Sequence, residues 1–219
     1  MRILINNWNL FKLFLIFTFT VFLVNSCVSI RTEYPTIEYY RLEQDPLTLK
    51  NVGKIDATIL IREVIPSSEL ESTSLMGIWD DGRIQRYNYH QWNSEIAPMV
   101  TDFIIKRLNL YSGFSGGVIK STSSILPDYI LETQLIDMMA YNSEKGNEGN
   151  YVFVSLQANL IRRIPLDTNK NIILSQVYNQ KISRKNNSVK SIAPAFSTAF
   201  SLLTDKLLID IQSAIATYR

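Results

Sequence analysis

The sequence is poor in the residues on which most metal sites and many enzymes depend. Its 219 residues include one cysteine, Cys27, and one histidine, His90. A single cysteine excludes an intrachain disulfide, and cysteine and histidine pairs at zinc-ligand spacing are absent. We therefore expect no metal and no cofactor. Stability has to come from a hydrophobic core, for which a hydrophobic content of 46% is sufficient.

The chain also lacks an excess of charge of either sign. It carries 22 basic and 20 acidic side chains. Two of the basic residues, Arg2 and Lys12, lie in the first 26 residues, which contain no acid, so the remainder is formally neutral. Proteins that bind nucleic acid carry clustered lysine and arginine. The composition therefore predicts no nucleic-acid partner.

Evidence for catalysis is weak as well. His90 could activate a serine only if one reaches it in space. Residues 113–117, Gly-Phe-Ser-Gly-Gly, match the letters of the Gly-x-Ser-x-Gly pattern, but Ser115 is interpreted as a loop serine with ordinary turn chemistry. The glycine-rich run at 113–117 lacks the Lys-Ser/Thr of a phosphate-binding loop and is interpreted as a turn. Asp80 and Asp81 could bind a hard cation, but EF-hand spacing is absent around them. The sequence therefore predicts a protein that is not an enzyme.

What the sequence does have is an uncharged apolar run at 13–24, preceded by two basic residues and followed by Asn-Ser-Cys. A basic start, a short apolar segment and a small residue before the cut are typical of a secretory signal. Residues 24–27, Val-Asn-Ser-Cys, resemble the lipobox of bacterial lipoproteins. In those proteins the cysteine is acylated and the chain is cut directly before it. Several acyl chains together hold a protein firmly on a membrane.

Two alternatives stay open: an uncleaved membrane span, and a plain signal in which Cys27 is incidental. Twelve apolar residues form about 18 Å of helix, whereas the hydrocarbon core is about 30 Å thick. A span is therefore disfavoured. We predict a lipoprotein signal peptide over 1–26, a lipid anchor on Cys27 with a tether over 27–35, and a single domain over 36–219.

The rest of the chain alternates between strand and helix patterns. An Asp80-Asp81-Gly82 turn predicts a hairpin, and short links between the later strands predict an antiparallel meander. Strands are predicted over 36–42, 55–62, 75–79, 83–89, 118–120, 129–140, 151–163 and 171–183. Helices with an apolar stripe are predicted from 94 or 95 to about 111 and from about 191 to 217. We expect an α+β fold with two amphipathic helices packed on one mostly antiparallel sheet.

Aromatic residues near the hairpin are candidate partner contacts. Trp92 is interpreted as a packing residue where the hairpin meets the helix, because tryptophan is usually buried. The alternative is a partner contact, because tryptophan is enriched in binding hot spots. The same ambiguity applies to the neighbouring aromatics. The candidate partner-binding residues are Trp79, Tyr89, His90 and Trp92.

Taken together, these features resemble the ABC-type transport auxiliary lipoproteins. Members pair a lipobox with an early Tyr-Tyr-x-Leu strand, here 39–42, and an isoleucine-rich strand, here 55–61. They continue with a tryptophan followed by a helix, here Trp92, and close on an amphipathic helix, here 193–216. One departure is Gln91, where many members carry arginine.

The resemblance implies a membrane-anchored subunit of a lipid-transport system rather than an enzyme. Its partners would be an ABC permease and ATPase and a substrate-binding protein with a mammalian-cell-entry (MCE) domain. Val28 after Cys27 agrees with sorting to the periplasmic face of the outer membrane, and a homo-oligomer is possible. The alternatives are a module that holds an acyl chain between sheet and helix, an envelope hydrolase using His90, and an unrelated envelope scaffold.

Overall fold

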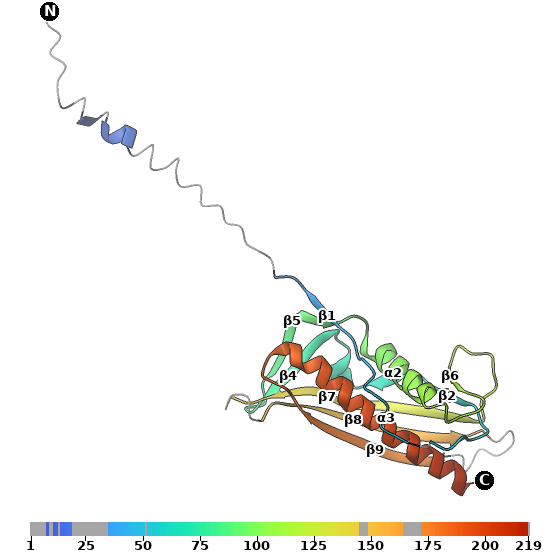
Figure 1. The fold of residues 1–219 in the computed structure, drawn as a ribbon. Helices are drawn as coiled ribbons and strands as arrows, with labels where there is room; N and C mark the ends of the chain where they lie inside the picture. The colour runs from blue at the N-terminus through green and yellow to red at the C-terminus, as the bar shows by residue number, and fades with distance from the viewer. Residues whose placement is uncertain are drawn as a thin grey trace, which may run out of the picture. The chain divides into compact units, whose positions relative to one another are not determined.

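A computed structural model describes residues 8, 11–12, 14–18, 35–50, 52–144, 149–163 and 172–218. The chain forms two units, Met1–Pro35 and Thr36–Arg219 (Figure 1). In the first unit, residues 14–18 are helical, which adds a helical segment to the two helices predicted. Cys27 and the predicted cleavage site lie outside the described residues.

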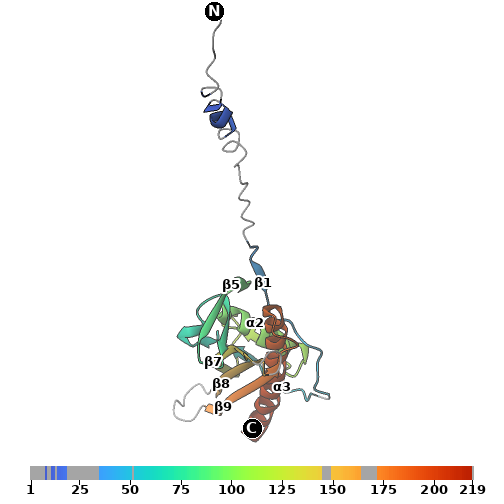
Figure 2. The same ribbon diagram turned by 90° about the vertical axis from the view of Figure 1, so that its left-hand side faces the viewer.

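The second unit is a nine-stranded mixed sheet with its helices packed along one face (Figures 1 and 2). The helices are α2 (Ile96–Leu110) and α3 (Ile192–Thr217), with short 3-10 helices η1 (Ser68–Leu70) and η2 (Val189–Ser191). The strands are β1 (Glu38–Tyr40), β2 (Ile59–Ile61), β3 (Ile65–Pro66), β4 (Ser74–Trp79), β5 (Ile84–Trp92), β6 (Val118–Lys120), β7 (Tyr129–Asn142), β8 (Tyr151–Arg162) and β9 (Ile172–Ser183).

Strand β7 is the centre of the sheet. On one side it pairs antiparallel with β8, which pairs antiparallel with β9. On the other side it pairs in turn with β2, β3 and β4, all parallel. β1 is parallel to β5 and β2 to β6, while β4 and β5 are antiparallel. The sheet is therefore mixed.

The prediction of a mostly antiparallel sheet was wrong, although the hairpin and the meander are confirmed. After the hairpin, α2 carries the chain back across the sheet before β6 and β7 begin. β5 and β6, the strands that α2 connects, run in opposite directions, but α2 brings the chain to the end of the sheet where β2 begins. β7 therefore runs beside β2, β3 and β4 in their own direction. The hairpin turns at Gly82, whose φ of +85° is a conformation that favours glycine.

The helices follow the predicted apolar spacing. α2 begins directly after its N-cap residue Glu95, whose side chain forms no cap hydrogen bond. The 189–217 segment is long and apolar enough to cross a membrane, but 72% of its most apolar window is buried inside the domain. α3 is therefore a core helix. Its buried stripe is Ile192, Phe196, Ala199, Phe200, Leu203, Leu207, Ile211 and Ile215.

The glycine-rich turn after α2 packs against the chain just before β2. Gly116 N–H donates to the Ala57 carbonyl at 3.1 Å. A Cβ on Gly116 would lie 1.9 Å from Thr58 Oγ1 and 3.1 Å from the Ala57 carbonyl carbon. The turn therefore has no room for a side chain at this position.

We expect Gly116→Ala to lower the free energy of unfolding by about 1–3 kcal/mol, because the backbone has to shift to admit the methyl group. Urea unfolding measures this change. Gly53→Ala is the control, because a Cβ there has nothing within 4 Å; a change within about 0.5 kcal/mol is expected. Equal stability of the two variants would contradict the close packing.

Candidate functional site

The first strand of the domain is held by a chain of polar contacts from three elements. Lys190 Nζ of η2 lies 2.6 Å from Glu38 Oε1 of β1, and the Tyr40 hydroxyl donates to Glu38 Oε2 at 2.6 Å. The same hydroxyl lies 2.9 Å from His90 Nδ1 of β5. Because the Tyr40 hydrogen is used on Glu38, His90 Nδ1 is assigned as the donor to Tyr40.

The pKa values of this cluster follow from its contacts. Hydrogen bonds from Lys190 and then Tyr40 hold the pKa of the Glu38 carboxyl below its ordinary value. Burial, with the hydrogen bond to Glu38, raises the pKa of the Tyr40 phenol well above its ordinary value. Glu38 therefore stays charged and Tyr40 stays a neutral donor. This arrangement suits a structural clamp on β1 more than proton transfer.

After β1 the chain runs as an extended strap, residues 41–49, along α3. Backbone N–H groups of Glu43 and Asp45 donate to Ser197 Oγ at 3.0 Å and Ser201 Oγ at 3.2 Å. Farther along, Thr48 Oγ1 donates to Asp205 Oδ2 at 2.6 Å. The three acceptors on α3 are four residues apart and share one helix face. The strap is therefore fixed to α3 at three points.

A buried ion pair joins α2, α3 and the strap. Arg107 Nε and Nη2 donate to the two Asp205 oxygens at 2.7 and 2.8 Å, and both side chains are almost fully buried. Arg107 also donates to the carbonyls of Asp45 and Pro46. Burial alone lowers the pKa of Arg107, but the hydrogen bonds and charge of Asp205 raise it above its ordinary value. The charged guanidinium thus links α2 to α3 and to the strap.

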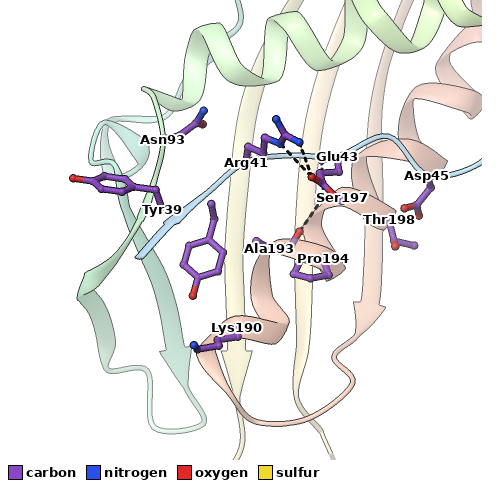
Figure 3. A pocket seen from close by; sticks show the side chains of 11 residues that line it. Tyr39, Arg41, Glu43, Asp45, Asn93, Lys190, Ala193, Pro194, Ser197 and Thr198 are labelled. Carbon is purple, nitrogen blue, oxygen red and sulfur yellow. Dashed lines mark hydrogen bonds and ion pairs between the residues drawn. The ribbon is translucent and has the colours of Figure 1, made fainter. Parts of the chain in front are cut away.

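A surface hollow of about 490 Å³ lies between β1, the strap and the start of α3 (Figure 3). Its rim carries charges of both signs, including Lys190 and the Arg41–Glu43 ion pair at 3.0 Å. Ser197 lines it from α3 and also anchors the strap. Four of its eleven lining side chains are charged, whereas an acyl-chain chamber is lined mostly by hydrophobic side chains.

The interior between sheet and helices is densely filled in the described residues. Val154 and Leu156 of β8 and Phe200 and Leu207 of α3 have no exposed surface. This packing does not favour the module that stores an acyl chain between sheet and helix. Docking therefore remains the stronger of the two interpretations.

The structure separates the four predicted partner-binding residues. Trp92 is 3% exposed and packs on Phe196 with ring centroids 6.0 Å apart, so it is a packing residue and is not available as a partner contact. Tyr89 is 51% exposed, and His90 lies within the clamp on β1. Trp79 lies near the hairpin turn, where its Nε1–H donates to Gln85 Oε1 at 2.9 Å.

These residues do not form one site. Gln85, beside Trp79, and His90 are five residues apart on β5, about 16 Å at the usual rise of a strand. The described contacts of His90 are with Glu38, Tyr40 and Tyr87, and none of them is a serine. In the described parts of the chain, no three His, Cys, Asp or Glu side chains gather as metal ligands.

Sequence reasoning missed two buried arginines. Arg107 lies on α2, and Arg184 lies directly after β9. Arg184 is 5% exposed; it donates to Ser191 Oγ at 3.1 Å and to the Ser188 carbonyl at 2.9 Å, and also contacts Asn142. Burial lowers its pKa. The only sequence signal for Arg107 is its position beside Ile104 and Leu108 on the apolar stripe of α2.

The other face of the sheet carries an aromatic cluster and a half-buried acid. Tyr141 stacks on Tyr151 at 4.6 Å between centroids, and Lys181 Nζ lies 3.8 Å from the Tyr151 ring. Asp137 lies on the same strand as Tyr141. Burial, and then the charge of Glu69, raises the pKa of Asp137 above its ordinary value.

We expect Asp137→Asn to be more stable than the unmodified protein at pH 7. An acid whose pKa is raised by folding destabilises the folded state above that pKa, and the penalty disappears as the pH falls through it. The difference in free energy of unfolding between the variant and the unmodified protein should therefore become smaller as the pH is lowered from 7 to 4. Urea midpoints measured across this range test it, and a less stable Asn variant at pH 7 would contradict it.

Comparison with known proteins places the fold. No family model matches the chain, and no curated protein matches it in sequence. The crystal structure of protein XCC0632 from Xanthomonas campestris, assigned to the family model DUF330, is similar with a TM-score of 0.66 and 14% identity. The likeness covers 78% of this chain and 92% of that one.

A second crystal structure, of an uncharacterized protein, has a TM-score of 0.62 and 11% identity, and covers 80% of this chain and 99% of that one. At these identities the similarity concerns the fold alone. The domain therefore has the α+β fold that these two solved proteins share.

Proposed function

We propose that this protein is a lipid-anchored, non-enzymatic component of a bacterial envelope that docks an ABC/MCE-type lipid-transport complex. The observation that carries the proposal is the fixation of the chain directly after the tether. β1 is clamped through Glu38 and Tyr40, and the strap is bonded to α3 at three positions. A lipid on Cys27 would therefore hold the whole domain at the membrane rather than a loose terminus.

The transport partners follow from the resemblance of the sequence to auxiliary lipoproteins. The packed interior supports docking over lipid storage, because the described side chains between sheet and helices, such as Val154 and Phe200, are fully buried against one another. Tyr89 is the most exposed of the predicted partner contacts, at 51%. We propose Tyr89 as the contact that a partner would cover, with Trp79 and His90 as less accessible candidates.

The proposal is tested by affinity purification of the tagged full-length protein from detergent-solubilised membranes of its own host. We expect an ABC permease, an ATPase and an MCE-domain protein to co-purify. Tyr89→Ala should lower their recovery about tenfold, as for a hot-spot residue contributing at least about 1.4 kcal/mol. Leu126→Ala, at a loop position that is 74% exposed, is the control and should leave recovery unchanged.

Two outcomes would contradict the proposal. The first is a purification of the membrane-bound protein in which no transport subunit is enriched. A tightly bound phospholipid at one per chain, recovered by extraction of the purified domain, would favour the lipid-carrying alternative.

A further inference from the structure

The sheet has one long open edge. Among the described residues, β9 pairs only with β8, so the far side of a 12-residue strand presents unpaired N–H and C=O groups. The sheet ends elsewhere in β1, β3 and β6, which are three, two and three residues long, and in the part of β5 before His90, which β1 does not reach. Figures 1 and 2 show β9 at the outer border of the sheet, beside α3.

The features by which proteins usually block an edge strand are scarce along β9. From Leu174 to Ser183 its register with β8 runs without a bulge. The strand contains no proline and no acid, and its one charge is Lys181. Ile172 and Val177 are exposed at 59% and 45%. A long, regular, nearly uncharged edge is built to pair with another strand.

α3 adds apolar side chains along the same edge. Thr198 of α3 and Ile182 of β9 border one hollow, so this helix face runs beside the strand. Leu202 and Ile209 follow Thr198 at helical spacing on that face. They are exposed at 37% and 47%. The edge of β9 and this stripe of α3 thus form one surface, which we call the β9 edge surface.

The charges of the β9 edge surface suit a second copy of the same chain. Lys206 Nζ lies 5.9 Å from the Tyr178 ring and 3.5 Å from Asp210 Oδ2, one turn farther along α3. A two-fold axis reverses the order of this pair, so opposite charges meet across it. With the axis near Val177, Lys181 of one copy lies opposite the uncharged start of β9 in the other copy. Lys185 and Lys190 border the hollow near Ile182, five or more residues from this axis, so the two-fold arrangement keeps these positive charges of the two copies apart.

We propose that two copies of the chain pair through β9, antiparallel about a two-fold axis near Val177. The two sheets then become one continuous sheet, with Leu202 and Ile209 of both copies packed beside the new strand pair. Such an interface is self-complementary, as two-fold contacts require. The proposal depends on neither the lipid anchor nor the transport role.

A cysteine scan in the full-length protein tests this pairing. Strands in a sheet lie about 4.8 Å apart, within the Cα separation that a disulfide bridges. A residue at the axis faces its own copy, whereas one six residues away is separated from its copy by about 40 Å. Gln176→Cys or Val177→Cys should therefore give at least tenfold more disulfide-linked dimer under mild oxidation than Ser183→Cys or Leu126→Cys.

Light scattering of the detergent-solubilised protein provides a second measurement. Val177→Lys combined with Leu202→Lys should convert a dimer to a monomer, and Leu126→Lys should not. A monomeric unmodified protein at micromolar concentration would overturn the proposal. So would cross-linking that appears at Leu202→Cys but at no position of β9, because the contact would then be made by helices. Cross-linking of the unmodified protein through Cys27 would instead contradict the lipid anchor and leave β9 pairing intact.

Discussion

Arg107→Ala is expected to lower the free energy of unfolding by about 3–5 kcal/mol, which is the range for breaking a buried pair by removing one partner. The substitution leaves Asp205 charged and 3% exposed, and it removes the donors to the carbonyls of Asp45 and Pro46. Denaturant unfolding followed by tryptophan fluorescence measures the loss. We expect the strap to loosen in the same variant, which hydrogen exchange at residues 43–49 would report.

The matched control is Arg41→Ala. Its ion pair with Glu43 is solvent-exposed, with about two thirds of each side chain accessible, and exposed pairs contribute about 0–1 kcal/mol. The double variant Arg107→Met with Asp205→Leu should recover part of the loss, because an apolar pair leaves no buried charge. Similar stabilities for Arg107→Ala and Arg41→Ala would contradict the role of the buried pair.

Cys27→Ser, with the leader over 1–26 replaced by a secretory signal whose cleavage does not need the cysteine, is expected to abolish acylation and move the protein from the membrane fraction to the soluble fraction. Acyl chains contribute about 0.8 kcal/mol for each buried methylene, and two or more chains are needed for stable anchoring. Without the thiol no acyl chain can be attached. In the part of the domain that the structure describes, the one helix long and apolar enough to cross a membrane is α3, and it is buried in the core. Fractionation followed by immunoblotting measures the distribution.

The folded state provides the control for this experiment. Because the tether precedes the clamp on β1, Cys27→Ser should leave the circular dichroism and the urea midpoint of the domain unchanged. Retention of this variant in the membrane after a salt wash would contradict the lipid on Cys27 as the membrane anchor.

The elements of the fold could be predicted from local pattern, whereas their direction could not. The alternation of apolar and polar residues in the sequence predicted β8. Apolar residues at helical spacing predicted α3, with its stripe from Ile192 to Ile215. A period of two does not say whether a strand runs parallel or antiparallel to its neighbour. The parallel pairing of β2, β3 and β4 with β7 depends on where α2 returns the chain, which is a tertiary property.

The candidate site was predictable only in part, for a similar reason. The packing interpretation of Trp92 was confirmed by its contact with Phe196, because a large aromatic between hairpin and helix is usually buried. The clamp on β1 and the Arg107–Asp205 pair join residues far apart in sequence, so no local sequence pattern predicts them. Arginine is almost never fully buried unless it is paired, and the partner is visible only in the folded chain.

The most direct test of the proposed anchored scaffold is mass spectrometry of the protein purified from native membranes. We predict that the mature chain begins at residue 27, that the leader over 1–26 is absent, and that Cys27 carries covalently bound acyl chains. Val28 should then be the second residue of the N-terminal peptide. An unmodified Cys27 thiol behind an intact leader would contradict the central claim that this domain works while tethered to a bilayer by lipid.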